Sequence, residues 1–222
     1  MQNQIIDYYQ QLAKNYDESR FKNSYGLYID SQERSILNSL NLDITKTLDI
    51  GCGTGRFLNF ANYGIDISSN MIMEAKLKFP EKNIQLGSLS NIPFADNYFK
   101  SALCFHVIMH LNKIETTAFL NEAHRIIEKK GTLIFDFPSE KRRKLIAYKS
   151  ENWHGANELS ADKIIKLTED NWKLTKQSGI LFLPIHRIPK KLRKFFIKID
   201  NLLCQSFLKN YASYIIMILE KK

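Results

Sequence analysis

The chain has few cysteines and no long apolar run. Its 222 residues include only Cys52, Cys104 and Cys204, which are widely spaced and form no C-x-x-C pair. Such a set argues against a disulfide framework or a zinc site and favours a reducing compartment. No apolar run is long enough to span a bilayer, and the opening MQNQIID lacks the features of a secretory signal. We therefore expect a cytoplasmic protein without a bound metal.

Repeats and low-complexity tracts are also missing. The chain is 44% hydrophobic and 25% charged, which is typical of a globular protein, and its length suits one domain. The net charge of +9 is concentrated in the basic clusters at 141–144 and 190–194. These clusters could meet RNA, anionic lipid or a phosphorylated substrate, but we favour a role in solubility because few aromatic residues are interleaved with them.

The most informative segment is LDIGCGTGRF at 48–57. An apolar strand runs into Gly51, Gly53 and Gly55, which permit unusual φ values and let a ligand approach the backbone. A helix is expected to start near Gly55 and to present free N–H groups to an anionic group such as an amino-acid carboxylate. Asp66 ends the next strand, where it could accept hydrogen bonds from two ribose hydroxyls. The pattern predicts a nucleoside-cofactor site.

The spacing separates two kinds of cofactor. A nicotinamide enzyme requires G-x-G-x-x-G and an acidic residue about 20 residues later. Here Arg56 takes the place of the last glycine, and Asp66 lies 15 residues after Gly51. The segments 48–57 and 64–68 instead resemble motifs of the class I S-adenosylmethionine-dependent methyltransferases, in particular the type 11-like domain.

The resemblance continues downstream and covers residues 45–138. Residues 87–94 resemble the adenine-side loop of the family, and 119–134 resemble its later helix-loop-strand unit. The resemblance implies an α/β fold with a Rossmann-like, seven-stranded, mostly parallel sheet, an antiparallel C-terminal edge strand and helices on both faces. It also implies S-adenosyl-L-methionine as the cofactor and no requirement for a metal.

Hydrophobic periodicity gives a coarse element map that fits this fold. Residues 1–222 are expected to form one domain, with an N-terminal helical cap at 1–44, a cofactor-binding core at 45–138 and a substrate-side insertion with C-terminal strands at 139–222. The pattern predicts helices at 2–15, 26–40, 69–78, 112–129 and 189–208, and strands at 46–50, 63–67, 83–86, 100–106, 131–137, 172–183 and 211–219.

The expected cofactor site combines the glycine loop, the following strand ends and the cap. Ser88 stands where many relatives have an aspartate that accepts a hydrogen bond from the adenine amino group, so it is a weaker partner. Tyr16 lies in a segment that resembles the part of the family that closes over the cofactor. The expected cofactor-binding residues are Tyr16, Asp49, Gly51, Cys52, Gly53, Asp66, Ile67, Met71, Ser88, Leu89 and His106.

Two histidines are the candidates for the chemistry. Transfer to a hydroxyl requires loss of a proton, and histidine is suited to accept it near neutral pH. His106 ends the fourth expected strand, and His154 lies in the loop region after the fifth. We expect each to be either a catalytic base or a substrate ligand, although a structural role stays open for both.

Residues 188–210 form a basic amphipathic pattern with apolar residues at helical spacing. This helix could cover the sheet or the substrate pocket, which we favour, or make peripheral contact with an anionic membrane. The leading function is methyl transfer to a hydroxyl or amine of a small metabolite, sugar or lipid-like acceptor. An RNA-modifying methyltransferase and a non-catalytic cofactor-binding module are the alternatives. The oligomeric state is not predicted.

Overall fold

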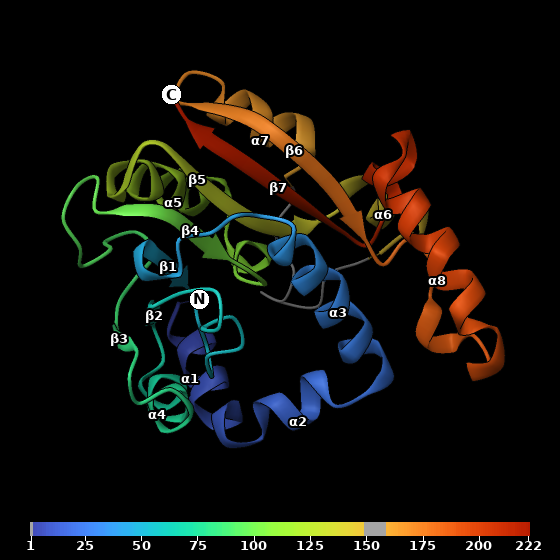
Figure 1. The fold of residues 1–222 in the computed structure, drawn as a ribbon, viewed down its shortest axis with the longest axis horizontal. Coiled ribbons are helices and arrows are strands. Elements are labelled where there is room, and N and C mark those ends of the chain that lie inside the picture. The colour runs from blue at the N-terminus through green and yellow to red at the C-terminus, as the bar shows by residue number, and fades with distance from the viewer. Residues whose placement is uncertain (1, 149–158) are drawn as a thin grey trace.

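A single mixed sheet forms the centre of the molecule. The computed structural model describes residues 2–148 and 159–222, and within them seven strands hydrogen-bond in the order β3-β2-β1-β4-β5-β7-β6 (Figure 1). The strands are β1 (Thr47–Ile50), β2 (Tyr63–Asp66), β3 (Asn83–Leu86), β4 (Phe99–Cys104), β5 (Ile127–Pro138), β6 (Trp172–Ile180) and β7 (Tyr214–Lys221). The strand order reverses between β1 and β4, the place where open α/β sheets bind ligands.

The strand directions confirm the predicted fold with one correction. Strands β1 to β5 are parallel, and β7 runs antiparallel to both β5 and β6. The C-terminal strand was expected at the edge of the sheet. It lies one position inside, because β7 forms ladders on both of its sides and β6 takes the edge.

Helices cover both faces of the sheet, as predicted. They are α1 (Gln2–Leu12), α2 (Tyr16–Phe21), α3 (Ser24–Asn38), α4 (Ser69–Lys78), α5 (Lys113–Ile126), α6 (Glu140–Leu145), α7 (Ala161–Thr168) and α8 (Lys190–Gln205). Side chains of Asn23, Ser68 and Asn112 accept hydrogen bonds from the first turns of α3, α4 and α5, which fixes where these helices begin.

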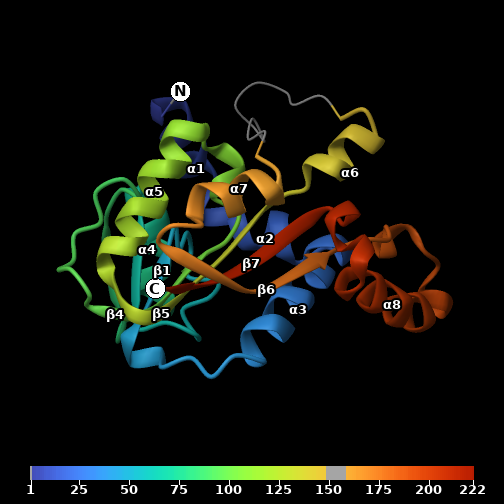
Figure 2. The ribbon, with the colours of Figure 1, turned by 90° about the horizontal axis from the view of Figure 1, so that it is seen from above.

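The core divides into two layers because alternate residues of each strand point to opposite faces. On one face, Phe119 of α5 and Ile164 of α7 pack with Met217 of β7. On the other, Ile29 of α3 and Phe196 of α8 pack around Ile216 of the same strand. Figure 2 shows α5 and α7 on one side of β5, β6 and β7 and α3 on the other.

The main error in the predicted element map concerns the glycine loop. Residues 51–60 form consecutive turns, with hydrogen bonds such as that from the Leu58 N–H to the Gly55 carbonyl, and no α-helix follows β1. Too few residues separate Gly55 from Gly64 to form a helix and still reach β2. The expected attraction of an anion to a helix N-terminus therefore does not apply at this loop.

Other differences are smaller. Strand β5 begins at Ile127, inside the predicted helix 112–129, because α5 ends at Ile126. The short helices α2, α6 and α7 were not predicted. His154 lies outside the described residues.

Candidate active site

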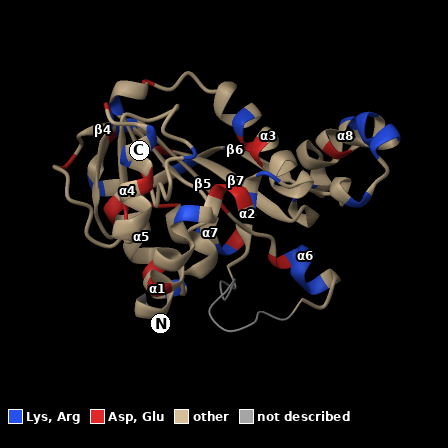
Figure 3. Ribbon diagram, turned by 90° about the horizontal axis from the view of Figure 1, so that it is seen from below, with Lys and Arg blue, Asp and Glu red and all other residues tan. Residues whose placement is uncertain are grey.

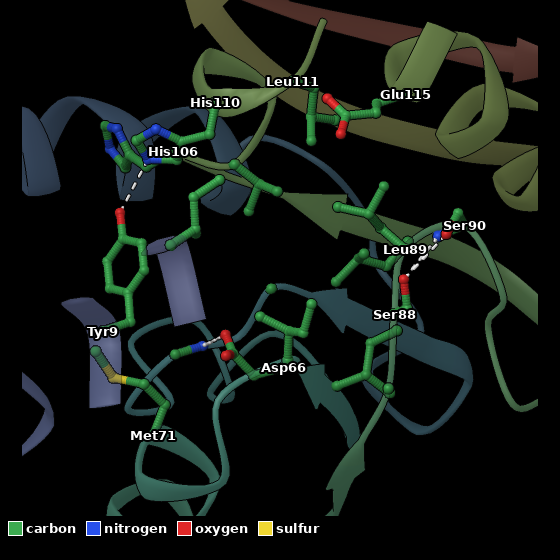
Figure 4. A pocket seen from close by; sticks show the side chains of 18 of the residues that line it. Tyr9, Asp66, Met71, Ser88, Leu89, Ser90, His106, His110, Leu111 and Glu115 are labelled. Atoms are coloured by element: carbon green, nitrogen blue, oxygen red, sulfur yellow. Dashed lines mark hydrogen bonds between the residues drawn. The ribbon is translucent and has the colours of Figure 1, made fainter. Parts of the chain in front are cut away.

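A cavity of about 300 Å³ opens at the carboxyl edge of the sheet. The loops after β1, β2, β3 and β4 form its floor, and α1, the start of α2 and α5 form its walls (Figure 4). Its lining is mainly apolar, with a few polar groups that converge from different loops. Ligand sites in proteins have this composition and a volume of this order.

The glycine loop and Asp66 meet at one end of this cavity. Gly53 has φ +53°, and a Cβ added there would meet no protein atom within 4 Å, so its surface faces open space. The Gly53 N–H donates to Oδ2 of Asp66 at 2.9 Å, and the Ser68 N–H donates to Oδ1 at 2.8 Å. Each carboxylate oxygen keeps a further lone pair, so Asp66 can still accept hydrogen bonds from a ligand.

Gly51 is needed for a different reason. Its φ is +73°, and a Cβ there would approach Cγ2 of Val107 to 2.4 Å. Glycine therefore lets the loop after β1 lie directly against the loop after β4. This close approach brings the two loops to the same wall of the cavity.

Nine of the eleven predicted cofactor residues line the main cavity. They are Tyr16, Gly51, Gly53, Asp66, Ile67, Met71, Ser88, Leu89 and His106. Figure 4 shows Asp66, Met71, Ser88 and Leu89 around the same space. The Ser88 hydroxyl lies 3.0 Å from that of Ser90, so the short adenine-side loop is held by its own side chains.

The other two predicted residues, Asp49 and Cys52, are almost fully buried. They line a small neighbouring cavity beneath the glycine loop, together with Arg56. Burial raises the pKa of the Asp49 carboxyl to about 7. The charge of Arg56 lowers this pKa and that of Asp66 raises it, and both effects are smaller than that of burial. Asp49 is therefore placed to support the loop from below rather than to face the main cavity.

His106 stands between two buried carboxylates. Its backbone has φ +59°, a left-handed conformation that is uncommon outside glycine, and its N–H donates to Oδ1 of Asp136 at 2.6 Å. The ring Nδ1 lies 3.5 Å from Oδ2 of Asp136, and Nε2 lies 2.7 Å from Oε1 of Glu33. Both ring nitrogens thus face an acceptor.

This arrangement favours the protonated imidazole. A neutral ring would turn one bare nitrogen toward a carboxylate, whereas the imidazolium presents an N–H to each carboxylate. Burial alone would lower the pKa of His106, but the charges of Asp136 and Glu33 outweigh it and raise that pKa. Arg56 lies 2.6 Å from the second oxygen of Glu33, so the cluster alternates in charge.

The same three residues form a set that could hold a metal ion within the described parts of the chain. The geometry fits a set of ion pairs among the side chains better than a set of ligands around a metal ion. The two carboxylates approach opposite nitrogens of the ring, and a guanidinium already occupies Glu33. We therefore assign no metal to this cluster.

A second cavity of about 120 Å³ adjoins the first. The two share a wall made of Tyr9, Tyr16, His106 and His110. The Tyr9 hydroxyl and Nε2 of His110 lie 2.9 Å apart, which joins α1 to the loop after β4 (Figure 4). The second cavity extends toward the cap and β7, where aromatic residues dominate its lining, namely Phe21, Tyr25 and Tyr214.

Several residues at the site were not predicted from the sequence. Glu33 and Asp136 are the partners of His106, and His110 is the partner of Tyr9. Glu115 lines the main cavity, although it is also the N3 residue of the capping box that starts α5. The N-x-x-E pattern at 112–115 signalled only a helix start, because nothing in it marks a nearby cavity.

Comparisons with known proteins agree with this architecture. Residues 48–135 match the family model described as a methyltransferase domain. An uncharacterized protein of Methanocaldococcus jannaschii is 28% identical over 238 residues, which cover 99% of each chain. The ubiquinone/menaquinone biosynthesis C-methyltransferase UbiE of Campylobacter jejuni is 28% identical over 149 residues, which cover 60% of this chain and 63% of UbiE.

A solved structure shows the same fold over nearly the whole chain. It is an S-adenosylmethionine-dependent methyltransferase of Thermotoga maritima, described as a possible histamine N-methyltransferase. The TM-score is 0.75 at 20% identity, and the alignment covers 98% of this chain and 99% of the other.

The sheet order, the cavity at the carboxyl edge and the matched domain define a Rossmann-like methyltransferase. More particularly, residues 48–135 match a methyltransferase domain, and the whole chain has the fold of an S-adenosylmethionine-dependent methyltransferase, which indicates S-adenosylmethionine as the cofactor. The predictions of family, enzyme class and cofactor are confirmed. None of the helices in the described ranges is long and apolar enough to cross a membrane.

Proposed function

We propose that the enzyme methylates a hydroxyl or an amine of a small-molecule acceptor bound in the second cavity. The observation that supports this proposal is the shared wall of Tyr9, Tyr16, His106 and His110, which separates two spaces of unequal size. The larger space suits the cofactor. The smaller one approaches the roughly 150 Å³ known to hold a single benzene ring, so a small ring or chain fits it.

The residues of the main cavity fit the cofactor in a definite orientation. Asp66 would accept hydrogen bonds from the ribose hydroxyls, and the bare surface of Gly53 would lie against the amino-acid part. Ser88 and Leu89, at the other end of the cavity, would contact the adenine. Tyr16, in the shared wall, would lie near the reacting groups.

The protein contributes mainly position and exclusion of water. The bound cofactor supplies an electrophilic methyl group on its sulfonium. In-line placement of two reactants can contribute up to about 7–11 kcal/mol in favourable cases. The apolar lining and the cap, closed by the contact between Tyr9 and His110, would hold the acceptor in that geometry away from water.

The surroundings of His106 bear on its predicted role. An imidazolium held between two carboxylates has no lone pair to accept a proton, which argues against a role as a base; His106 lines both cavities, so a substrate would contact its ring face or edge rather than a free N–H. His110, whose Nε2 lies against the Tyr9 hydroxyl, is the alternative acceptor of a proton at this wall. His154 stays a prediction.

A carbon acceptor is the second candidate. UbiE, by its name, is a C-methyltransferase, and its likeness extends over 60% of this chain. An RNA acceptor rests only on the basic clusters.

Methyl-labelled S-adenosylmethionine and a panel of phenols, amines, quinols and RNA will distinguish these acceptors, with the methylated atom located by NMR. Met109 lines the second cavity but not the first, so Met109→Trp should abolish transfer while leaving S-adenosylhomocysteine binding unchanged. Met73→Trp, at a half-exposed position on α4, is the matched control. Labelling of RNA alone, or full activity of Met109→Trp, would contradict the proposal.

A further inference from the structure

One end of the molecule combines exposed apolar side chains with most of the net charge. The segments 140–148 and 190–211 contain ten basic and two acidic residues, which leaves +8 of the total +9 there. Among the described residues, eight of the fourteen large exposed hydrophobic side chains also lie in these segments. We call this region the basic apolar end.

Helix α8 is the main part of this end and is firmly attached by one face. Asp200 is fully buried and accepts a hydrogen bond from the Tyr28 hydroxyl at 2.7 Å, and Phe196 packs into the core layer below. The opposite face is apolar but has no cover. Leu192, Phe195 and Leu202 are 52%, 64% and 72% exposed, and their spacing puts them on one side of the helix.

Two shorter segments extend the same surface. The 3-10 helix η5 (Phe207–Tyr211) follows α8 and packs against both α8 and α6. Phe207 is 88% exposed, and Leu145 and Ile146 at the end of α6 are also exposed. Figure 3 shows the Lys and Arg residues of α6 and α8 at the same end of the molecule, although 44 residues separate the two helices in sequence.

We propose that the basic apolar end docks on an anionic phospholipid bilayer. A solvated basic face would explain the lysines alone, but exposed Leu, Ile and Phe side chains between them have no such explanation. Apolar side chains that enter the headgroup region, flanked by lysines that pair with anionic lipid, are typical of peripheral membrane helices. Single-stranded RNA would be expected to stack on aromatic platforms, but four of the eight exposed side chains are aliphatic and offer no stacking face, whereas both kinds can enter a headgroup region.

The position of this end links it to the active site. Helix α6 follows the carboxyl end of β5, and Tyr214, which pairs with Pro138 there, lines the second cavity. A bilayer under the basic apolar end would therefore lie beside the edge where the cavities open. If the proposed function holds, this geometry favours an acceptor that is dissolved in or attached to the membrane. The docking itself does not depend on that function.

Flotation of the whole protein with phosphatidylcholine vesicles, with and without phosphatidylglycerol, tests the docking. We expect binding only to the anionic vesicles, weakened by salt. Phe195→Ser with Leu202→Ser should reduce partitioning about tenfold or more. Lys191→Glu with Lys194→Glu should also reduce partitioning. The loss of each positive charge should lower it about fivefold, and the negative charge that replaces it should lower it further. These side chains are exposed, so the fold should tolerate the changes.

Matched controls are available on α4, away from this end. Leu77→Ser and Lys76→Glu alter equally exposed side chains and should leave partitioning unchanged. S-adenosylhomocysteine binding by calorimetry should be the same in all variants, which separates failed docking from a failed cofactor site. No flotation of the wild type, flotation insensitive to the α8 changes, or capture by RNA or self-association in place of vesicles would overturn the proposal.

Discussion

The cofactor side and the cap side of the site are built in different ways. On the cofactor side, Gly51, Gly53 and Asp66 lie within 16 residues of one another and meet through two adjacent parallel strands. On the cap side, Glu33 of α3 pairs with His106 of the loop after β4. Tyr9 of α1 contacts His110, which lies 101 residues later in the sequence. Local sequence thus specifies the first group, and only the complete fold brings the second together.

The largest expected effect tests the cap side. Glu33 is fully buried and pairs with both His106 and Arg56. Glu33→Ala leaves two partly buried cations without their fully buried shared partner, so the free energy of unfolding should fall by about 3–5 kcal/mol. Denaturant unfolding measures it. Glu18→Ala, which removes an exposed pair with Lys22, should change nothing measurable, and equal effects of the two substitutions would refute the buried cluster.

A smaller, pH-dependent effect tests the cofactor side. Burial raises the pKa of Asp49 to about 7 in the folded protein. A raised pKa contributes stability that is fully present below the unfolded value of about 4 and is lost as pH rises toward 7, by as much as about 4 kcal/mol. Asp49→Asn should remove this slope and be the more stable protein at pH 8.

The quantity to compare is the difference in stability between wild type and Asp49→Asn at each pH, because the other titrating groups contribute equally to both proteins. Thermal unfolding from pH 4 to 8 gives it directly. Glu81→Gln, an exposed position after α4, serves as the control and should follow wild type throughout. Parallel curves for wild type and Asp49→Asn would show that Asp49 is not the buried acid described here.

The smallest effect tests the contact that closes the cap. Tyr9→Phe removes one partly buried hydrogen bond to His110, which is worth about 1 kcal/mol. We expect kcat/KM to fall about fivefold once an acceptor is known. Tyr8→Phe is the control, because Tyr8 lines neither cavity. An equal loss in both variants would point to general damage to α1.

These contrasts explain what the sequence could and could not reveal. The positions of the strands follow from periodicity, and most of the nine cavity residues follow from short motifs, each made of a few neighbouring residues at the end of one strand. The turns that replace the expected helix after Gly55 were missed because residue types alone do not show that the chain must return to β2 so soon. Glu33 and Asp136 gave no signal, since an acid in a helix or strand looks the same whether or not a distant histidine meets it.

The basic clusters on the surface also show what the sequence alone could not reveal. In sequence they are two separate charge runs that fit simple solubility. In the structure they share one end with uncovered leucine and phenylalanine side chains. The periodicity of 190–205 predicted an amphipathic helix, but only packing shows that one apolar side faces the core while another faces solvent.

Calorimetric titration of S-adenosylhomocysteine into wild type and Asp66→Ala tests the central claim most directly, with Glu81→Ala as the control. Loss of two hydrogen bonds to a carboxylate should weaken binding by roughly 100-fold in Asp66→Ala and leave the control unchanged. Binding to wild type that is absent, or that is as tight in Asp66→Ala, would contradict the placement of the cofactor between the glycine loop and the end of β2.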